Sequence, residues 1–287
     1  MTKTTTLQIQ SQTLDAERAL YNLASPIVTD CSFDGPADGE SALKECTDVQ
    51  VERCFFNLRY PLWHCNGARI SNSEMTALCR APLWYCQDVH LCHNRMHGVK
   101  ALRECEHVVI KDCDIQSAEF GWSVRDIKIS DSKIEGEYLF LRAEDLSVSS
   151  LHLLGKYSFQ YVKGATLTDC TFDTKDAFWH AEDITLKNCT IKGEYLAWYS
   201  RNLTLINCRI IGTQPFCYCT GLRLIDCEML DADFCFERSE VEATVTTPVI
   251  SIRRPRSGTV RVPAVGEILE DDSDARGEIL LPAPAAQ

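Results

Sequence analysis

The stretch that decides the fold is residues 184–202, which read ITLKNCTIKGEYLAWYSRN. Residues 203–221 then read LTLINCRIIGTQPFCYCTG, and residues 222–240 read LRLIDCEMLDADFCFERSE. The pattern returns every nineteen residues, with two residues inserted between 68 and 89, and a period of this length is typical of solenoid proteins. The repeat units begin at Val49, Ala68, Val89, Val108, Ile127, Leu146, Ala165, Ile184, Leu203, Leu222 and Val241.

Each repeat carries apolar residues two positions apart, as in Ile127 and Ile129. Residues with this spacing face the same side of a strand. Nineteen residues leave no room for a strand, a helix and both loops, and they are not a multiple of the six that a left-handed hexapeptide helix needs. We therefore predict an all-β fold, a single-stranded right-handed parallel β-helix. It would have about eleven coils of 19 residues, three short strands per coil and a coil spacing of ~4.8 Å.

Three columns rich in Asp, Asn or Gly mark the corners of the coil, because these residues tolerate the positive φ of tight bends. One of them is a glycine column: Gly98, Gly136, Gly155, Gly193 and Gly212. We expect a single β-helix domain over residues 15–252. A basic turn at 253–258 and an acidic stretch at 267–278 predict a C-terminal cap and a partly disordered tail over 253–287.

Charge and cysteine content indicate the setting of the protein. The net charge of −12 argues against nucleic acid or an anionic membrane as the main partner. The first 21 residues contain no apolar stretch typical of a signal peptide, so we expect a cytoplasmic protein with reduced thiols. Twelve of the 16 cysteines fall in two repeat columns and are interpreted as core residues. A metal site of Cys217, Cys219 and Cys235 with His180 is conceivable, but we expect neither a metal nor a cofactor.

One column, fourteen residues into each unit, contains all five tryptophans. This Trp column consists of Tyr21, Trp63, Trp84, Trp122, Trp179, Trp198 and Phe236. The preceding Phe column contains Leu62, Leu83, Phe140, Phe159, Phe178 and Phe216. The following outer column contains His64, Tyr85, Glu104, Arg142, Tyr161, His180, Tyr199, Tyr218 and Glu237.

Two interpretations of the Trp column remain open. If the Phe column points inward, the Trp column points outward, because neighbours on a strand alternate. The tryptophans would then line a groove suited to the apolar faces of sugar rings. If the tryptophans point inward, they fill the core. On the outward interpretation the ligand-binding candidates are Trp63, Trp84, Trp122, Tyr138, Lys156, Tyr157, Trp179, Tyr195, Trp198 and Tyr199.

Carboxylates beside this column are the candidates for acid–base catalysis. Asp176 and Glu194 occupy equivalent positions, within one residue, on adjacent coils. We expect their carboxyl groups to lie roughly 5–7 Å apart, a separation compatible with a glycosidase-like pair. Glu137 and His180 are further catalytic candidates. The alternative is that these charged side chains are simply solvated on an outward face.

Several motifs distributed along the chain resemble one known family. They are ERAL at 17–20, GES-LKE at 39–45, YPLW at 60–63, DAFW at 176–179, GEYLAW at 193–198 and GEIL at 266–269. Their order and spacing resemble the mainly bacterial domain-of-unknown-function family numbered 3737, over residues 15–270. The resemblance implies a right-handed β-helix of the pectin-lyase-like kind and implies no activity. The chain departs from pectate lyases because it lacks a clear Asp-rich calcium constellation.

Two functional hypotheses follow. The first is a β-helix that binds, and as a carbohydrate-active hydrolase or lyase would modify, a saccharide-like ligand along the aromatic face. The second is a non-catalytic scaffold or homo-oligomerisation module whose aromatic column lies in a core or an interface. Neither requires nucleic acid or a membrane.

Overall fold

Residues nineteen apart lie side by side in the structure, a computed structural model that describes residues 7–283. Ile184 pairs with Leu203, and Val89 pairs with Val108, each in a parallel register. The chain divides into an N-terminal unit, residues 7–147, and a C-terminal unit, residues 148–283. Each unit is a right-handed parallel β-solenoid, as predicted. Together they contain about 14 turns of about 19 residues, more than the eleven coils expected from the repeat. Within residues 7–283 no helix has the length and apolarity to cross a membrane.

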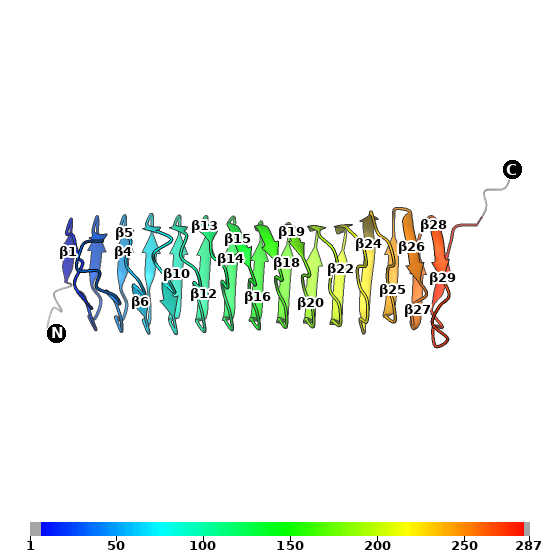
Figure 1. Ribbon diagram of the computed structural model, residues 1–287, viewed down its shortest axis with the longest axis horizontal. Helices are drawn as coiled ribbons and strands as arrows, with labels where there is room; N and C mark the ends of the chain where they lie inside the picture. Colours follow the sequence, from blue (N-terminus) through cyan, green and yellow to red (C-terminus); the bar gives the residue numbers. More distant parts are fainter. Residues whose placement is uncertain (1–6, 284–287) are drawn as a thin grey trace, which may run out of the picture. The chain divides into compact units, whose positions relative to one another are not determined.

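The N-terminal unit stacks two kinds of strand, which form two faces of each coil (Figure 1). The first-face strands are β1 (Gln8–Gln10), β2 (Ile27–Thr29), β4 (Gln50–Glu52), β7 (Arg69–Ser71), β10 (Gln87–Cys92), β12 (Glu106–Lys111) and β14 (Arg125–Ser130). The second-face strands are β3 (Ser32–Phe33), β5 (Phe55–Phe56), β8 (Glu74–Met75), β11 (Arg95–Met96), β13 (Asp114–Gln116) and β15 (Lys133–Glu137). Strand β16 (Glu144–Ser149) spans the boundary between the units.

The C-terminal unit repeats this arrangement. Its first-face strands are β18 (Lys163–Thr168), β20 (Glu182–Lys187), β22 (Arg201–Ile206), β24 (Leu222–Leu230), β25 (Glu240–Val245), β27 (Ser257–Arg261) and β29 (Glu278–Leu280). The other strands are β17 (His152–Lys156), β19 (Thr171–Lys175), β21 (Thr190–Lys192), β23 (Arg209–Ile211), β26 (Val249–Arg253) and β28 (Val265–Leu269). Strand β24 is long enough to pair with both β22 and β23.

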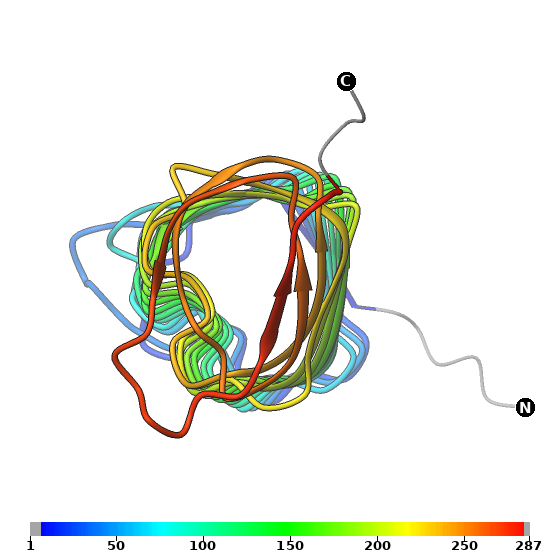
Figure 2. The same ribbon diagram turned by 90° about the vertical axis from the view of Figure 1, so that its right-hand side faces the viewer.

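We predicted three short strands per coil, but most of the coils that the structure describes have no strand on their third side. The strand pair there within residues 7–283 is β6 (Leu62–Trp63) with β9 (Leu83–Trp84). In other coils alternate residues have positive φ, as at Asp176 (56°), Phe178 (59°) and His180 (54°). A residue with left-handed backbone conformation (positive φ) cannot continue an extended strand, so the chain curls on this side (Figure 2). We call this side of the coils the curled face.

Hydrogen bonds still tie the curled face to its neighbouring coils. The amide of Asp176 donates to the carbonyl of Glu194 (3.0 Å) on the following coil, whereas the amide of Phe178 donates to the carbonyl of Ser158 (2.9 Å) on the preceding coil. The alternating φ therefore sends successive bonds in opposite directions along the stack.

The interior of each unit is mainly apolar, as the alternation in the sequence predicts. Strand β20 has the burial pattern expected of one inward face, with Ile184 and Leu186 buried. All 16 cysteines are free, and 15 of them are buried, so Cys92 is the exception. Burial without disulfides fits their interpretation as core residues.

Parallel pairing extends past both expected domain limits, 15 and 252. At one end β1 pairs with β2, and at the other β27 pairs with β25 and β29 pairs with β27. The basic turn and the acidic stretch form ion pairs, for example Arg254 with Glu270 and Arg253 with Asp271. The tail expected to be partly disordered continues into residues 284–287, which lie outside the described residues.

Candidate functional site

The Phe column points into the core and the Trp column points outward. Phe159, Phe178 and Phe216 are fully buried, whereas all five tryptophans are only partly buried. The tryptophans therefore point outward, as the first interpretation proposes. Phe236, in the same column, is the exception, because it is buried. The side chains that follow, in the outer column, are mostly exposed.

Hydrogen bonds hold several indole rings in place across the coils. The indole Nε1 of Trp179 donates to the carbonyl of Tyr195 (2.6 Å), and that of Trp198 donates to the carbonyl of Gln214 (2.8 Å). Trp122 makes the equivalent bond to Tyr138 (2.5 Å). The edge of each ring is thus anchored to backbone, which orients its plane.

Ring stacking covers the aromatic faces in the C-terminal unit. Tyr161, His180, Tyr199 and Tyr218 stack in sequence, with centroid separations of 4.8, 5.1 and 4.7 Å and interplanar angles of 8–9°. Behind them Trp179 stacks on Trp198 at 5.4 Å and 5°. Each inner ring of these stacks is covered on both faces and presents its edge to solvent. A sugar ring binds to an aromatic face, so a continuous stack of this kind offers it little surface.

The outer column is interrupted in the N-terminal unit. His64 stacks on Tyr85 (5.0 Å), but the next two positions of the outer column hold Glu104 and Ser123, which have no ring. A hollow of about 490 Å³ opens there. It is lined by His64, Tyr85, Gln87, Glu104, Glu106, Ser123 and Arg125. Tyr85, 39% exposed, stacks on His64 (5.0 Å), lies nearly parallel to Trp84 (5.5 Å, 12°) and borders the polar hollow.

The polar side chains around this hollow differ in whether they have ion-pair or hydrogen-bond partners. Arg125 bridges Glu106 (3.1 Å) and Glu144 (3.2 Å), so its charge is balanced by two carboxylates. Within the described residues no ion pair or hydrogen bond reaches the carboxylate of Glu104. Behind the hollow Arg103 takes the place of a tryptophan and lies over the rings of Trp84 (5.4 Å) and Trp122 (4.4 Å). The hollow thus offers an exposed carboxylate beside an aromatic face.

The predicted catalytic carboxylates occupy different environments. The side chain of Asp176 is buried, at 6% exposure, and this burial raises its pKa against the opposing effect of Lys175. Glu194 is exposed and forms an ion pair with Lys175 (Nζ–Oε2 2.8 Å). A raised pKa makes a carboxyl a better candidate for a proton donor than an ordinary aspartate. Of the other candidates, His180 stands in the aromatic stack and Glu137 belongs to the N-terminal unit.

The remaining predicted ligand-binding residues are distributed over the two units. Trp63 stacks on Trp84 (5.7 Å), and both indole nitrogens are buried without a hydrogen-bond partner in the described part of the chain. Tyr195 lies edge-on to Trp198 (5.4 Å, 80°). Tyr138 and Lys156 are exposed, Tyr157 is partly buried, and Tyr199 is exposed. Of these candidates Trp84 adjoins the hollow most directly, because Tyr85 follows it in the chain.

The substitution Asp176→Asn is expected to raise the melting temperature at pH 7. Because the pKa of Asp176 is raised in the folded state, folding favours its protonated form. The stability that this contributes is fully present below the ordinary pKa of 3.8 and is lost as pH rises through the folded-state pKa. Asparagine resembles the protonated acid at every pH, so the advantage of the variant should shrink toward zero below pH 3.8. Thermal melts between pH 3 and pH 7 measure this, with Glu194→Gln as the exposed control. A variant less stable than wild type at pH 7 would contradict the account.

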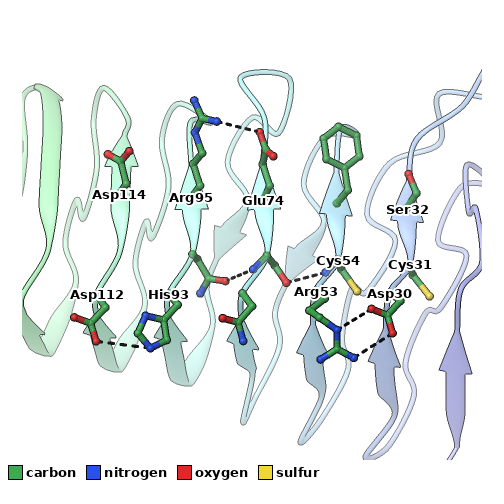
Figure 3. A pocket seen from close by; sticks show the side chains of 14 residues that line it. Asp30, Cys31, Ser32, Arg53, Cys54, Glu74, His93, Arg95, Asp112 and Asp114 are labelled. Atoms are coloured by element: carbon green, nitrogen blue, oxygen red, sulfur yellow. Dashed lines mark hydrogen bonds and ion pairs between the residues drawn. The ribbon is translucent and has the colours of Figure 1, made fainter.

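A second groove, of about 790 Å³, runs over the coils of the N-terminal unit and was missed by sequence reasoning (Figure 3). Arg53 forms an ion pair with Asp30 (Nε–Oδ1 2.8 Å) on one side of it, and His93 lies near Asp112 on the other. Between them the amide of Cys54 donates to Ser73 Oγ (3.0 Å), and the amide of Ser73 donates to Asn94 Oδ1 (2.9 Å). The signal in the sequence was the corner column, the polar residues directly before the core cysteines, such as Asp112 before Cys113 and Asn188 before Cys189. We interpreted them only as residues suited to bends.

Cys217, Cys219 and Cys235, which we weighed as metal ligands but did not predict, do not form a site with His180. The three cysteines are buried, whereas His180 is exposed in the aromatic stack. Over residues 7–283 they are not among the groups of side chains whose ligand atoms converge.

Comparison with solved structures gives distant likenesses. A surface adhesin of Streptococcus pneumoniae, PfbA, is 8% identical, with a TM-score of 0.47 over 86% of this chain and 83% of that chain. The A-module of the mannuronan C-5 epimerase AlgE4 of Azotobacter vinelandii is 9% identical, with a TM-score of 0.31 over 97% and 88%. Similarity this low gives no basis for transferring a function.

Comparison with curated proteins gives no significant match. A protein family does match, over residues 7–279, which is nearly all of the chain. The motifs that suggested the resemblance to family 3737, from ERAL at 17–20 to GEIL at 266–269, lie within this range. The chain therefore belongs to the family described as "Protein of unknown function (DUF3737)".

Proposed function

We propose that this protein binds a neutral saccharide at the hollow beside Tyr85. The observation that carries the proposal is the interruption of the outer aromatic column: the stack of His64 on Tyr85 ends at Glu104, and a hollow of about 490 Å³ begins there. A volume of this size falls within the range of small-molecule sites. Elsewhere on the aromatic face, stacking partners cover the rings of His180 and Tyr199.

The groups around the hollow match the chemistry of a sugar. The apolar face of a pyranose ring packs against an aromatic ring, and its hydroxyls bond to carboxylate, carboxamide and guanidinium groups. Tyr85 would supply the ring, while Gln87 and Glu104 would supply polar partners. Since Arg125 is already balanced by two carboxylates, the hollow has no spare positive charge for an acidic sugar. This favours a neutral ligand.

The substitution Tyr85→Ala is expected to weaken binding by about tenfold or more, because the stacking surface is lost. A glycan screen on wild-type protein would first identify a ligand, and isothermal titration calorimetry would then compare variants. Glu104→Gln should also weaken binding while leaving the ring in place. Tyr199→Ala is the matched control, an exposed tyrosine covered on both faces by His180 and Tyr218, and should bind as wild type does.

Two results would contradict the proposal. One is the absence of any glycan ligand for the folded protein, and the other is equal loss of affinity in Tyr85→Ala and Tyr199→Ala. Light scattering of the same samples would measure their oligomeric state and so test the alternative that the protein is a homo-oligomer. If wild type is an oligomer that Tyr85→Ala dissociates, the aromatic face is an interface between copies.

Catalysis on a saccharide is a second candidate function, favoured by the raised pKa of Asp176 beside the ion pair of Lys175 and Glu194. In this proposal Asp176 is the proton donor and Glu194 the second carboxylate of a hydrolase or lyase. Product analysis after incubation with glycans would test it. Turnover by wild type that is lost in both Asp176→Asn and Glu194→Gln supports it. Turnover retained in both variants, or absent from wild type, overturns it.

A further inference from the structure

We propose that Cys92, His93 and Asp112 form a binding site for a divalent transition-metal ion of the Zn²⁺ type. Their potential ligand atoms all lie within 4.8 Å of one another. Cys92 is the one cysteine of the chain that is not buried, and it stands outside the two core columns. His93 and Asp112 both line the groove of about 790 Å³, so an ion could reach them (Figure 3).

Local backbone geometry brings these three side chains together. Cys92 ends strand β10 next to the buried Leu91, so its side chain points outward. His93 follows with φ 55°, and Asp112 follows strand β12 with φ 52°, which gives both corners the same left-handed bend. The amide of His93 donates to the carbonyl of Lys111 (3.1 Å), which fixes the spacing of the two corners. The side chains of His93 and Asp112 are thereby held on adjacent coils.

The His93–Asp112 pair is more open than other pairs of the same corner column. Asn188 donates to Asp169 at 3.0 Å, Asn207 donates to Asn188 at 3.0 Å, and Arg53 donates to Asp30 at 2.8 Å. His93 Nε2 and Asp112 Oδ2 are 3.9 Å apart, too far for a hydrogen bond. With Zn–N and Zn–O bonds of about 2 Å, two ligands of a tetrahedral ion lie roughly 3.3 Å apart. The pair is therefore closer to the geometry of two ligands sharing an ion than to that of a direct bond.

The donor set determines the kind of ion. A thiolate, an imidazole and a carboxylate together suit an ion of borderline softness, whereas Mg²⁺ and Ca²⁺ prefer oxygen ligands alone. Three protein ligands would leave a fourth tetrahedral position for water. The thiolate also provides a spectroscopic signature, because Co²⁺ bound to sulfur absorbs by charge transfer.

The test is a Co²⁺ titration of the full, reduced chain, followed by competition with Zn²⁺. We expect one equivalent of Co²⁺ to produce a thiolate charge-transfer band that Zn²⁺ removes. Cys92→Ser should abolish the band, and His93→Ala and Asp112→Asn should each weaken binding by about tenfold or more. Serine is already present at the equivalent position of the preceding coil, Ser71, and of a coil further on, Ser130, so Cys92→Ser should fold.

A matched control is available in the same unit. His107 Nδ1 lies 3.5 Å from Asp88 Oδ1 on adjacent coils, a His–Asp pair without a cysteine. His107→Ala should retain the band and the affinity of wild type. Three results would overturn the proposal: no charge-transfer band in wild type with native circular dichroism, a band that survives in Cys92→Ser, or an equal loss in His107→Ala.

Discussion

Gly193→Ala is expected to lower the free energy of unfolding by about 3–5 kcal/mol. The φ of Gly193 is 154°, a conformation that residues with a side chain rarely adopt. A Cβ built there would lie 2.1 Å from the carbonyl oxygen of Thr174 on the preceding coil. That oxygen is backbone, so relief of the clash requires the two coils to separate. Urea denaturation followed by circular dichroism would measure the loss.

Gly221→Ala is the matched control for this prediction. Gly221 also has positive φ (66°), but its added Cβ would meet the side-chain Oδ1 of Asn202 at 2.7 Å. A flexible side chain can move away, so only the backbone strain remains, about 1 kcal/mol. Equal losses for Gly193→Ala and Gly221→Ala would mean that close contact between the coils does not set the cost.

The second large effect is expected for Phe178→Ala, which should cost about 3–5 kcal/mol. Phe178 is fully buried. Its ring stacks on Phe159 (4.8 Å, 8°) and meets the edge of Phe172 (6.2 Å, 71°). Alanine would leave a cavity between coils whose backbones are fixed by hydrogen bonds, and this limits collapse of the cavity. The same urea denaturation measures the cost.

Phe178→Leu separates cavity formation from backbone strain. Leucine retains a Cβ at a position with φ 59° and fills most of the ring volume, so the cost should be below about 2 kcal/mol. If Phe178→Ala were no more destabilising than Phe178→Leu, the Phe column would not be the packed interior that its burial indicates.

The repeat was enough to predict most of the fold. Residues such as Ile184 and Leu203 pair as the nineteen-residue step predicts. In the glycine column, Gly193 and Gly212 have the positive φ expected of a bend, whereas Gly98 and Gly136 do not. The curled face was not predictable in the same way. Its left-handed positions hold residues such as Phe178 and Ala197, which by themselves favour negative φ, and only the stacked coils impose this conformation.

Less of the site could be predicted. The sequence placed the tryptophans in one column, but the plane of a ring depends on bonds such as that from Trp179 to the Tyr195 carbonyl. The repeat alone also does not reveal that Trp179 and Trp198 stack face to face. The hollow beside Tyr85 exists because the next position of the outer column holds a residue without an aromatic ring, Glu104. Glu104 looked like an ordinary polar member of the outer column until the structure located the gap.

The most direct test of the central claim is a crystal structure of the protein with the saccharide that the glycan screen identifies. We expect a sugar ring against Tyr85, with hydroxyls bonded to Glu104 or Gln87. A sugar bound elsewhere, with the hollow beside Tyr85 open to solvent, would contradict it.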